Sequence, residues 1–120
     1  MLLVDAANVV GSRPTGWWKD RPGAARTFIE QLRAALGSGR LDAPVVVVLE
    51  GKARAGFPAG EADGLTVVHA EGSGDDTLLA ATAAASDQAT LVTADRALRQ
   101  RAEALGATVV GPTWLLRLLE

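Results

Sequence analysis

The run VVVVL at residues 45–49 is the clearest strand in the sequence and decides the class of fold. It holds four β-branched residues and a leucine, with no polar residue among them. A strand with one solvated face alternates apolar and polar residues, whereas a strand covered on both faces is apolar throughout, as in parallel sheets. The run therefore predicts an inner strand of a parallel α/β sheet.

Four further apolar runs alternate with segments of helical periodicity. These runs are residues 2–5, 65–69, 89–93 and 107–111. Helices are expected at residues 21–36, 75–85 and 95–105, with a short last helix opened by Pro112. Such alternation is typical of a mainly parallel sheet with right-handed crossovers. We therefore expect one α/β domain over residues 1–120, with a five-stranded sheet of order 3-2-1-4-5, counted along the chain.

The composition excludes several classes of protein. The chain has 120 residues, 48% of them hydrophobic, so it can bury a core and does not resemble a disordered segment. It contains no cysteine, which excludes disulfides and thiolate zinc sites. No apolar run approaches the about 20 residues of a membrane span, and no signal peptide is recognisable. We expect a cytoplasmic protein without membrane contact.

Five acidic residues lie at the ends of predicted strands or at the starts of predicted helices. Asp5 ends the first strand, Glu50 follows the second, Asp75 and Asp76 begin the helix after the third, and Asp95 follows the fourth. Open α/β sheets bind ligands beyond the carboxyl ends of their strands, where the winding reverses. We therefore expect these carboxylates to converge at one edge of the sheet.

Converging carboxylates need a counter-charge, because neighbouring negative groups cannot all stay ionised without one. A helix N-terminus contributes only about 0.3–1 kcal/mol per negative group. Oxygen ligands favour Mg²⁺ or Mn²⁺, and a single histidine with no cysteine argues against zinc.

Each acid also has a structural explanation. Asp95 and one of Asp75 and Asp76 could be helix N-caps, and Glu50 could be a solvated strand end. Asp5 fits such an explanation least, because an unpaired charge beside a central apolar strand costs several kcal/mol.

Residues near the acids are candidates for supporting roles. Asn8 could hold a ligand or form an Asx turn, and Thr93 could orient a carboxylate or be an ordinary strand residue. Trp17 and Trp18 lie among basic residues, which suits base stacking and phosphate contact, although one of them could pack on the core. The basic candidates for RNA contact are Arg13, Lys19, Arg21, Lys52, Arg54 and Arg96.

Other phosphate chemistries lack their residues in this chain. The GSG stretch at residues 72–74 has no Lys-Ser/Thr of a P-loop, and no Ser-His-Asp arrangement can be built around the single His69, which we expect to be structural. A receiver domain needs an Asp after the third strand and a Lys after the fifth, where this chain has HAEG and GPTW. A haloacid-dehalogenase-like phosphatase needs a second Asp where Ala7 stands.

The ordered series of motifs resembles the NYN domain, a group of PIN-like ribonucleases, and is most similar to its YacP-like branch. The motifs are LLVDAANVV, GWWKD, GAARTFIEQL, VVVVLEGKARAG, GSGDDTLLAAT and LVTADRALRQRAEALGATVV. The resemblance implies a PIN-like three-layer α/β/α sandwich and an acidic, Mg²⁺- or Mn²⁺-dependent endoribonuclease site. By position, it implies Asp5, Asp76 and Asp95 as central acids. It implies Asn8, Glu50 and Asp75 as supporting members, with Glu50 standing where relatives tend to have Asp.

Two functions follow as hypotheses. The first is a metal-dependent endoribonuclease that hydrolyses RNA phosphodiester bonds at the carboxylates and grips the strand through the tryptophans and basic residues. The alternative is a PIN-like module with weak or no catalysis that binds RNA or a protein partner. The sequence leaves open the RNA substrate, whether one or two metal ions bind, and whether the chain forms a homodimer.

Overall fold

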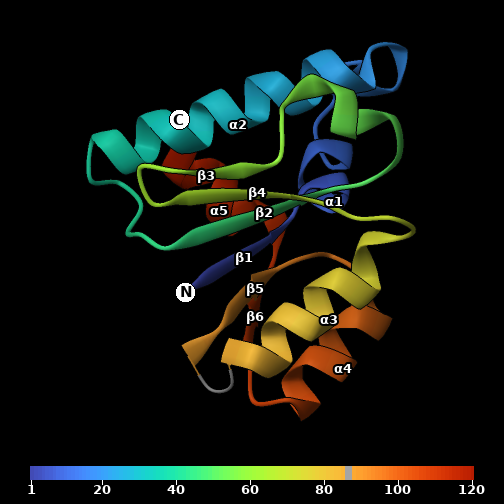
Figure 1. The fold of residues 1–120 in the computed structure, drawn as a ribbon, viewed down its shortest axis with the longest axis vertical. Coiled ribbons are helices and arrows are strands. Elements are labelled where there is room, and N and C mark those ends of the chain that lie inside the picture. Colours follow the sequence, from blue (N-terminus) through green and yellow to red (C-terminus); the bar gives the residue numbers. More distant parts are fainter. Residues whose placement is uncertain (86–87) are drawn as a thin grey trace.

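The residues of the VVVVL run form an inner strand of a parallel sheet in the computed structural model, which describes residues 1–85 and 88–120 (Figure 1). The strands in the described part of the chain are β1 (Leu2–Asp5), β2 (Val45–Leu49), β3 (Gly60–Ala62), β4 (Leu65–His69), β5 (Thr90–Val92) and β6 (Thr108–Val110). The α-helices there are α1 (Ala6–Gly11), α2 (Arg21–Gly37), α3 (Gly74–Ala85), α4 (Arg96–Ala104) and α5 (Pro112–Leu119). In the described residues, the 3₁₀ helices η1 (Trp17–Lys19) and η2 (Gly51–Gly56) follow α1 and β2.

The sheet order is β3-β4-β2-β1-β5-β6. Strand β2 pairs in parallel with β1 on one side and β4 on the other, so that Val47 lies opposite both Val4 and Val67. The parallel strands therefore follow the order β4-β2-β1-β5-β6, which confirms the predicted order 3-2-1-4-5. Because β1 lies between β2 and β5, the chain reverses its winding at β1, and Asp5 ends that strand.

The prediction of five strands is wrong, because β3 adds a sixth at the edge of the sheet. It pairs antiparallel with β4 through a two-residue turn at Asp63 and Gly64, both of which have positive φ (53° and 84°). Such a turn favours Asp-Gly and closes a hairpin. The three residues of β3 are all exposed, so hydrophobic patterning could not find the strand. The Asp-Gly pair was the available signal.

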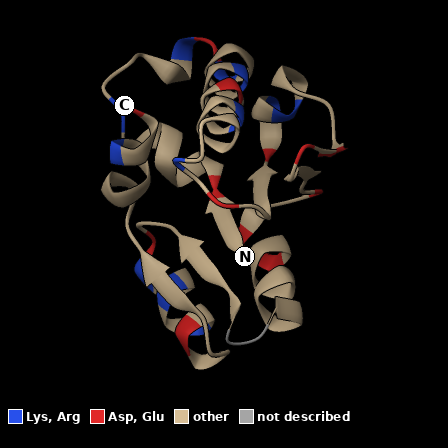
Figure 2. Cartoon of the chain, turned by 90° about the vertical axis from the view of Figure 1, so that its left-hand side faces the viewer, with Lys and Arg blue, Asp and Glu red and all other residues tan. Residues whose placement is uncertain are grey.

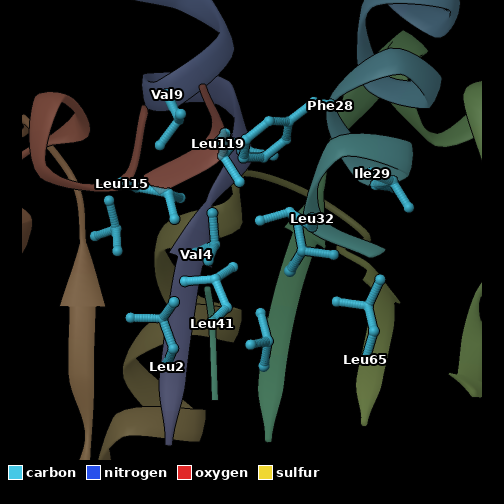
Figure 3. Packing of buried hydrophobic residues seen from close by; sticks show 14 of the residues in the cluster. Leu2, Val4, Val9, Phe28, Ile29, Leu32, Leu41, Leu65, Leu115 and Leu119 are labelled. Carbon is cyan, nitrogen blue, oxygen red and sulfur yellow. The ribbon is translucent and has the colours of Figure 1, made fainter. Parts of the chain in front are cut away.

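Helices cover both faces of the sheet, with α1, α2 and α5 on one side and α3 and α4 on the other (Figure 1). Successive side chains of a strand point to opposite faces. Leu2 and Val4 accordingly pack with Phe28 of α2 (Figure 3), whereas Leu3 packs in the second core, with Leu78 of α3. The two layers explain why β2 is apolar throughout, and they confirm the α/β class.

Local signals explain where the helices begin. Helix α2 starts after Asp20, whose carboxylate accepts a hydrogen bond from Gly23 N at 3.0 Å, with Pro22 in its first turn. Helix α5 begins at Pro112, as predicted. The carboxyl ends of β1, β2 and β4 lie together on the right of Figure 1, where α1 and α3 begin. This edge carries the predicted acids.

Candidate functional site

Asp5 is the last residue of β1 and also the N-cap of α1. Its side chain is buried, with 4% of its surface exposed. One carboxylate oxygen, Oδ2, accepts a hydrogen bond from Asn8 Nδ2 at 2.8 Å, and Oδ1 accepts a longer one from Asn8 N at 3.4 Å. Asn8 therefore fixes the Asp5 carboxylate, while Oδ1 stays the less engaged oxygen.

Thr93 joins Asp5 to Asp95 across two neighbouring strands. It follows β5 and is buried, and its Oγ1 donates a hydrogen bond to Asp5 Oδ2 at 2.8 Å. The same Oγ1 accepts a hydrogen bond from Asp95 N at 3.2 Å. The Thr93 hydroxyl thus orients the Asp5 carboxylate and also the backbone of Asp95.

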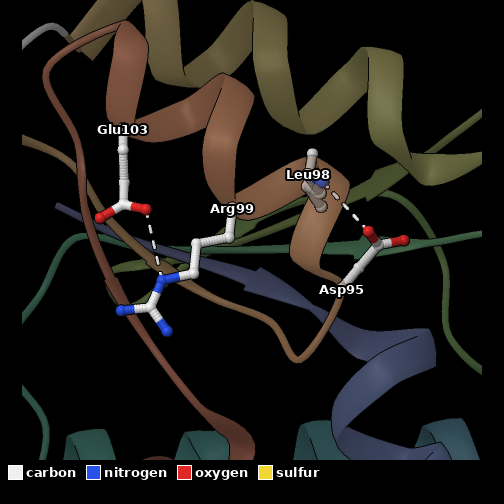
Figure 4. A network of polar contacts seen from close by, with 4 residues as sticks. All are labelled: Asp95, Leu98, Arg99 and Glu103. Carbon is white, nitrogen blue, oxygen red and sulfur yellow. Dashed lines mark hydrogen bonds and ion pairs between the residues drawn. The ribbon is translucent and has the colours of Figure 1, made fainter.

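Asp95 is the N-cap of α4, one of the two roles that the sequence allows it. Its Oδ1 accepts a hydrogen bond from Leu98 N at 3.0 Å (Figure 4). The exposed pair of Arg99 and Glu103, one turn apart on the same helix, is separate from this contact. Capping thus uses one of the two Asp95 carboxylate oxygens. The side chain is half-buried at the sheet edge.

Glu50 connects β2 to the start of α3. Its Oε2 accepts a hydrogen bond from Gly74 N at 2.7 Å, which places a negative charge at the positive end of the helix. The next two residues differ in exposure, since Asp75 is half-buried and Asp76 is exposed.

The pKa values show that these carboxylates affect one another. Burial raises the pKa of Asp5, and the charge of Glu50 raises it further, whereas hydrogen bonds from Thr93 and Asn8 partly offset both effects. Burial also raises the pKa of Asp75, followed by the charges of Asp95 and Glu50. We call Asp5, Glu50, Asp75 and Asp95 the acidic centre. They come from four separate segments of the chain.

The side chains of the acidic centre offer only oxygen atoms as donors to a cation. Among residues 1–85 and 88–120, no three His, Asp or Glu side chains lie close enough together to hold one metal ion. Mg²⁺ usually keeps several waters and binds through one or two carboxylates, so it does not require such a cage. All-oxygen donors with unbalanced negative charge suit a hydrated hard cation.

The predicted RNA-contact residues lie in different surroundings. Trp17 and Arg21 line a cavity of 380 Å³, together with Glu50 of the acidic centre. Trp18 is 57% exposed and meets Trp17 edge to face, with 5.9 Å between ring centroids. Lys19, Lys52 and Arg96 are exposed.

Arg13 and Arg54, two further predicted RNA contacts, have partners within the protein. The Arg13 guanidinium lies over the Phe28 ring, 5.7 Å from its centroid, and burial lowers its pKa. Arg54 donates hydrogen bonds to the carbonyl oxygens of Gly51 and Ala70. Both residues therefore hold the loops around the site. His69 Nε2 lies 2.7 Å from Phe57 O, which agrees with its expected structural role.

Sequence reasoning missed the small residues that make room for this cavity. Ala6, Ala25 and Ala53 line it, from α1, α2 and η2. In an alanine-rich chain such residues carry no distinct signal, because alanine is also the best helix former.

Comparison with known proteins identifies the fold. No family model matches the sequence, and no curated protein is similar to it. Among solved structures, the crystal structure of Rae1 (YacP) from Bacillus subtilis is similar, with a TM-score of 0.71 and 19% sequence identity. The match covers 98% of this chain and 72% of that chain. This chain has a YacP-like fold.

None of the helices in the described part of this YacP-like fold is long and apolar enough to cross a membrane.

Replacing Thr93 with valine should lower the free energy of unfolding by about 1–3 kcal/mol, because a buried carboxylate and a backbone N–H both lose a partner. Urea unfolding measured at neutral pH tests this. Thr93→Ser is the matched control, since it keeps the hydroxyl and should retain most of the stability. A valine variant as stable as the wild type would show that the hydroxyl holds neither residue.

Proposed function

We propose that the protein is a Mg²⁺- or Mn²⁺-dependent endoribonuclease of the NYN group of PIN-like domains, acting at the acidic centre. The observation that carries the proposal is the buried Asp5 carboxylate at the winding reversal of the sheet. Glu50 lies near enough to raise the pKa of Asp5, and the charges of Asp95 and Glu50 raise the pKa of Asp75. The resemblance of the motifs to the YacP-like branch and the YacP-like fold both support it.

In this proposal, Asp5, Asp75 and Asp95 hold the cation directly or through water. Asp5 would use Oδ1, because Oδ2 already accepts two short hydrogen bonds from Asn8 and Thr93. A bound divalent cation supplies a Lewis acid that polarises the phosphate and lowers the pKa of the attacking water. Asn8 and Thr93 act on Asp5, keeping its carboxylate in one orientation.

The basic residues offset the repulsion between the acids and an RNA backbone. Lys and Arg lie on helices on both sides of the sheet (Figure 2). The candidates that stand nearest the acids in sequence, Lys52 and Arg96, are exposed and would contact phosphates.

A cleavage assay tests the proposal. An RNA without stable structure, labelled at both ends, is incubated with the protein in Mn²⁺, in Mg²⁺ or in excess chelator. We expect internal cleavage with either metal, none with chelator, and none by the double variant Asp5→Asn/Asp95→Asn. Cleavage that persists in chelator, or full activity of the double variant, would overturn the proposal.

Adjacent acids on α3 provide a matched pair of variants. The resemblance assigns the central role to Asp76, but the half-buried Asp75 has its pKa raised by Asp95 and Glu50, so we place Asp75 in the inner position. Asp75→Asn should lower cleavage by at least about 10-fold, the usual cost of disturbing groups around a metal, and Asp76→Asn by much less. Rates measured at several metal concentrations check this. The reverse order would restore Asp76 as the central acid.

The alternative function is a module that binds RNA or a protein without cutting. It is favoured by the structural contacts of the acids, since Asp5 and Asp95 cap helices and Glu50 binds the start of α3. In that case the wild type would not cleave RNA with any metal, and Asp5→Asn would bind RNA as tightly as the wild type.

A further inference from the structure

The proposed chemistry leaves unused a cavity that lies beside the acidic centre. It lies between α1, η1, α2, the end of β2, η2 and the loop before α3, and its volume is 380 Å³. This volume lies in the range of about 300–1,000 Å³ typical of small-molecule sites. Because Glu50 lines the cavity and is also part of the acidic centre, a ligand in the cavity would touch the acidic centre.

An aromatic and a cationic side chain form one wall of the cavity. Trp17 lines it, and the Arg21 guanidinium lies 5.5 Å from the Trp17 ring centroid. Ala6, Ala25 and Ala53 also line the cavity, and their short side chains leave the space open. An indole beside a guanidinium is a typical platform for a nucleic-acid base.

Glu50 supplies a carboxylate to the cavity, beside the polar side chains of Arg21 and Ser73, and this carboxylate is already held in place. Glu50 Oε2 accepts the hydrogen bond from Gly74 N, which ties its side chain to the start of α3. An ionised carboxylate only accepts hydrogen bonds, so it selects ligands that offer an N–H and disfavours those that present carbonyl oxygens.

We propose that this cavity binds one unpaired base of the RNA strand, stacked against Trp17 and donating an amino hydrogen to Glu50. The choice of RNA as ligand rests on the proposed function. Adenine, cytosine and guanine carry an exocyclic amino group, whereas the N3–H of uracil lies between two carbonyl oxygens that a carboxylate would repel, so uracil is the disfavoured base. Glu50 is then a specificity residue, in place of the metal-ligand role suggested by its position in the sequence.

Fluorescence of a single tryptophan tests the proposal without catalysis. The chain has three tryptophans, and Trp18→Phe/Trp114→Phe leaves only Trp17. This variant is titrated in chelator with hexanucleotides of adenylate, cytidylate or uridylate. We expect saturable quenching by the first two and at least several-fold weaker binding of the third.

Substitutions in the wild-type background identify the residues responsible, with affinities measured by anisotropy of labelled hexanucleotides. Trp17→Ala should weaken binding of oligoadenylate by roughly 5- to 150-fold, the loss expected for one stacked base. Trp17→Phe keeps an aromatic ring and should retain most of the affinity. It provides a second test of stacking in case the alanine variant misfolds. Trp114→Ala is the matched control, because Trp114 is exposed, lies on α5 and does not line the cavity.

Glu50→Gln tests the choice of base. The amide still accepts the hydrogen bond from Gly74 N and also offers a donor, so the preference for adenylate over uridylate should narrow or vanish. A purely structural Glu50 would leave the preference unchanged, which would overturn its role in specificity.

The two proposals fail in different ways. Base-selective binding in chelator without any cleavage in metal would overturn the nuclease and keep the base site. Metal-dependent cleavage, combined with unchanged binding by Trp17→Ala, would overturn the base site and keep the nuclease. Quenching of Trp17 by apolar peptides and not by oligonucleotides would also overturn the base site.

Discussion

Asp5→Asn should abolish RNA cleavage while leaving the folded protein at least as stable as the wild type at neutral pH. Activity should fall by more than about 100-fold, because disturbing even the outer residues of metal sites costs about 10–100-fold. The asparagine Oδ1 can accept the hydrogen bonds that Asn8 and Thr93 now donate to Oδ2. Only the long contact from Asn8 N at 3.4 Å loses its acceptor, while a buried charge is removed.

The stability difference should depend on pH in a defined direction. Burial raises the pKa of Asp5 above its ordinary value of 3.8, so the folded state binds the proton more tightly than the unfolded state. The stability from this group is therefore complete below pH 3.8 and is lost as the pH rises through the folded pKa. Relative to the wild type, Asp5→Asn should gain most at neutral pH and least near pH 4.

Urea unfolding in chelator between pH 7 and pH 4.5 measures this difference, and the cleavage assay measures the loss of activity. Asp20→Asn is the control, because it changes an exposed N-cap to another good N-cap and should alter neither quantity. A variant of Asp5 that is less stable at every pH, by a constant amount, would show that its hydrogen bonds outweigh the cost of its burial.

Gly56→Ala should lower the free energy of unfolding by at least about 3 kcal/mol, the upper part of the range for overpacked sites. A Cβ at this buried position would overlap the carbonyl oxygen of Pro22 and lie 2.9 Å from its carbonyl carbon. Both atoms are backbone, so η2 and the start of α2 would have to separate. Because these two elements line the cavity, oligonucleotide binding should weaken as well.

Gly37→Ala is the matched control for this prediction. Gly37 ends α2, and a Cβ at this position would meet no atom within 4 Å, so alanine should be neutral or stabilise the helix by up to about 1 kcal/mol. Thermal and urea unfolding of the two variants check the contrast. Equal stability of both would mean that η2 moves away from α2 at little cost.

The parallel part of the fold could be predicted because each strand carries its own signal. The apolar run at residues 45–49 reports burial on both faces, and the helical periodicity around Phe28 and Leu32 reports a helix with one buried face. Strand β3 could not be found in this way, since its residues bury nothing and depend on the turn at Asp63 and Gly64 for their pairing.

The acids could be placed at one edge for the same reason, because parallel strands bring their carboxyl ends together. The role of each individual acid could not be predicted from the sequence. Asp75 and Asp76 are neighbours of identical chemistry, and only the packing of α3 makes one half-buried and leaves the other exposed. The contacts of Arg13 with Phe28 and of Arg54 with Ala70 likewise depend on segments that the sequence does not show to be close.

By itself, the sequence determined the α/β class, the order of the parallel strands and the gathering of acids beyond them. These properties follow from local periodicity, which records the face that each segment buries. Only the tertiary structure decided that Thr93 holds Asp5 across 88 residues, that Glu50 binds the start of α3, and that a cavity opens beside Trp17. Such features depend on how the layers pack, since a hydrogen bond or a cavity is made by atoms from segments distant in the chain.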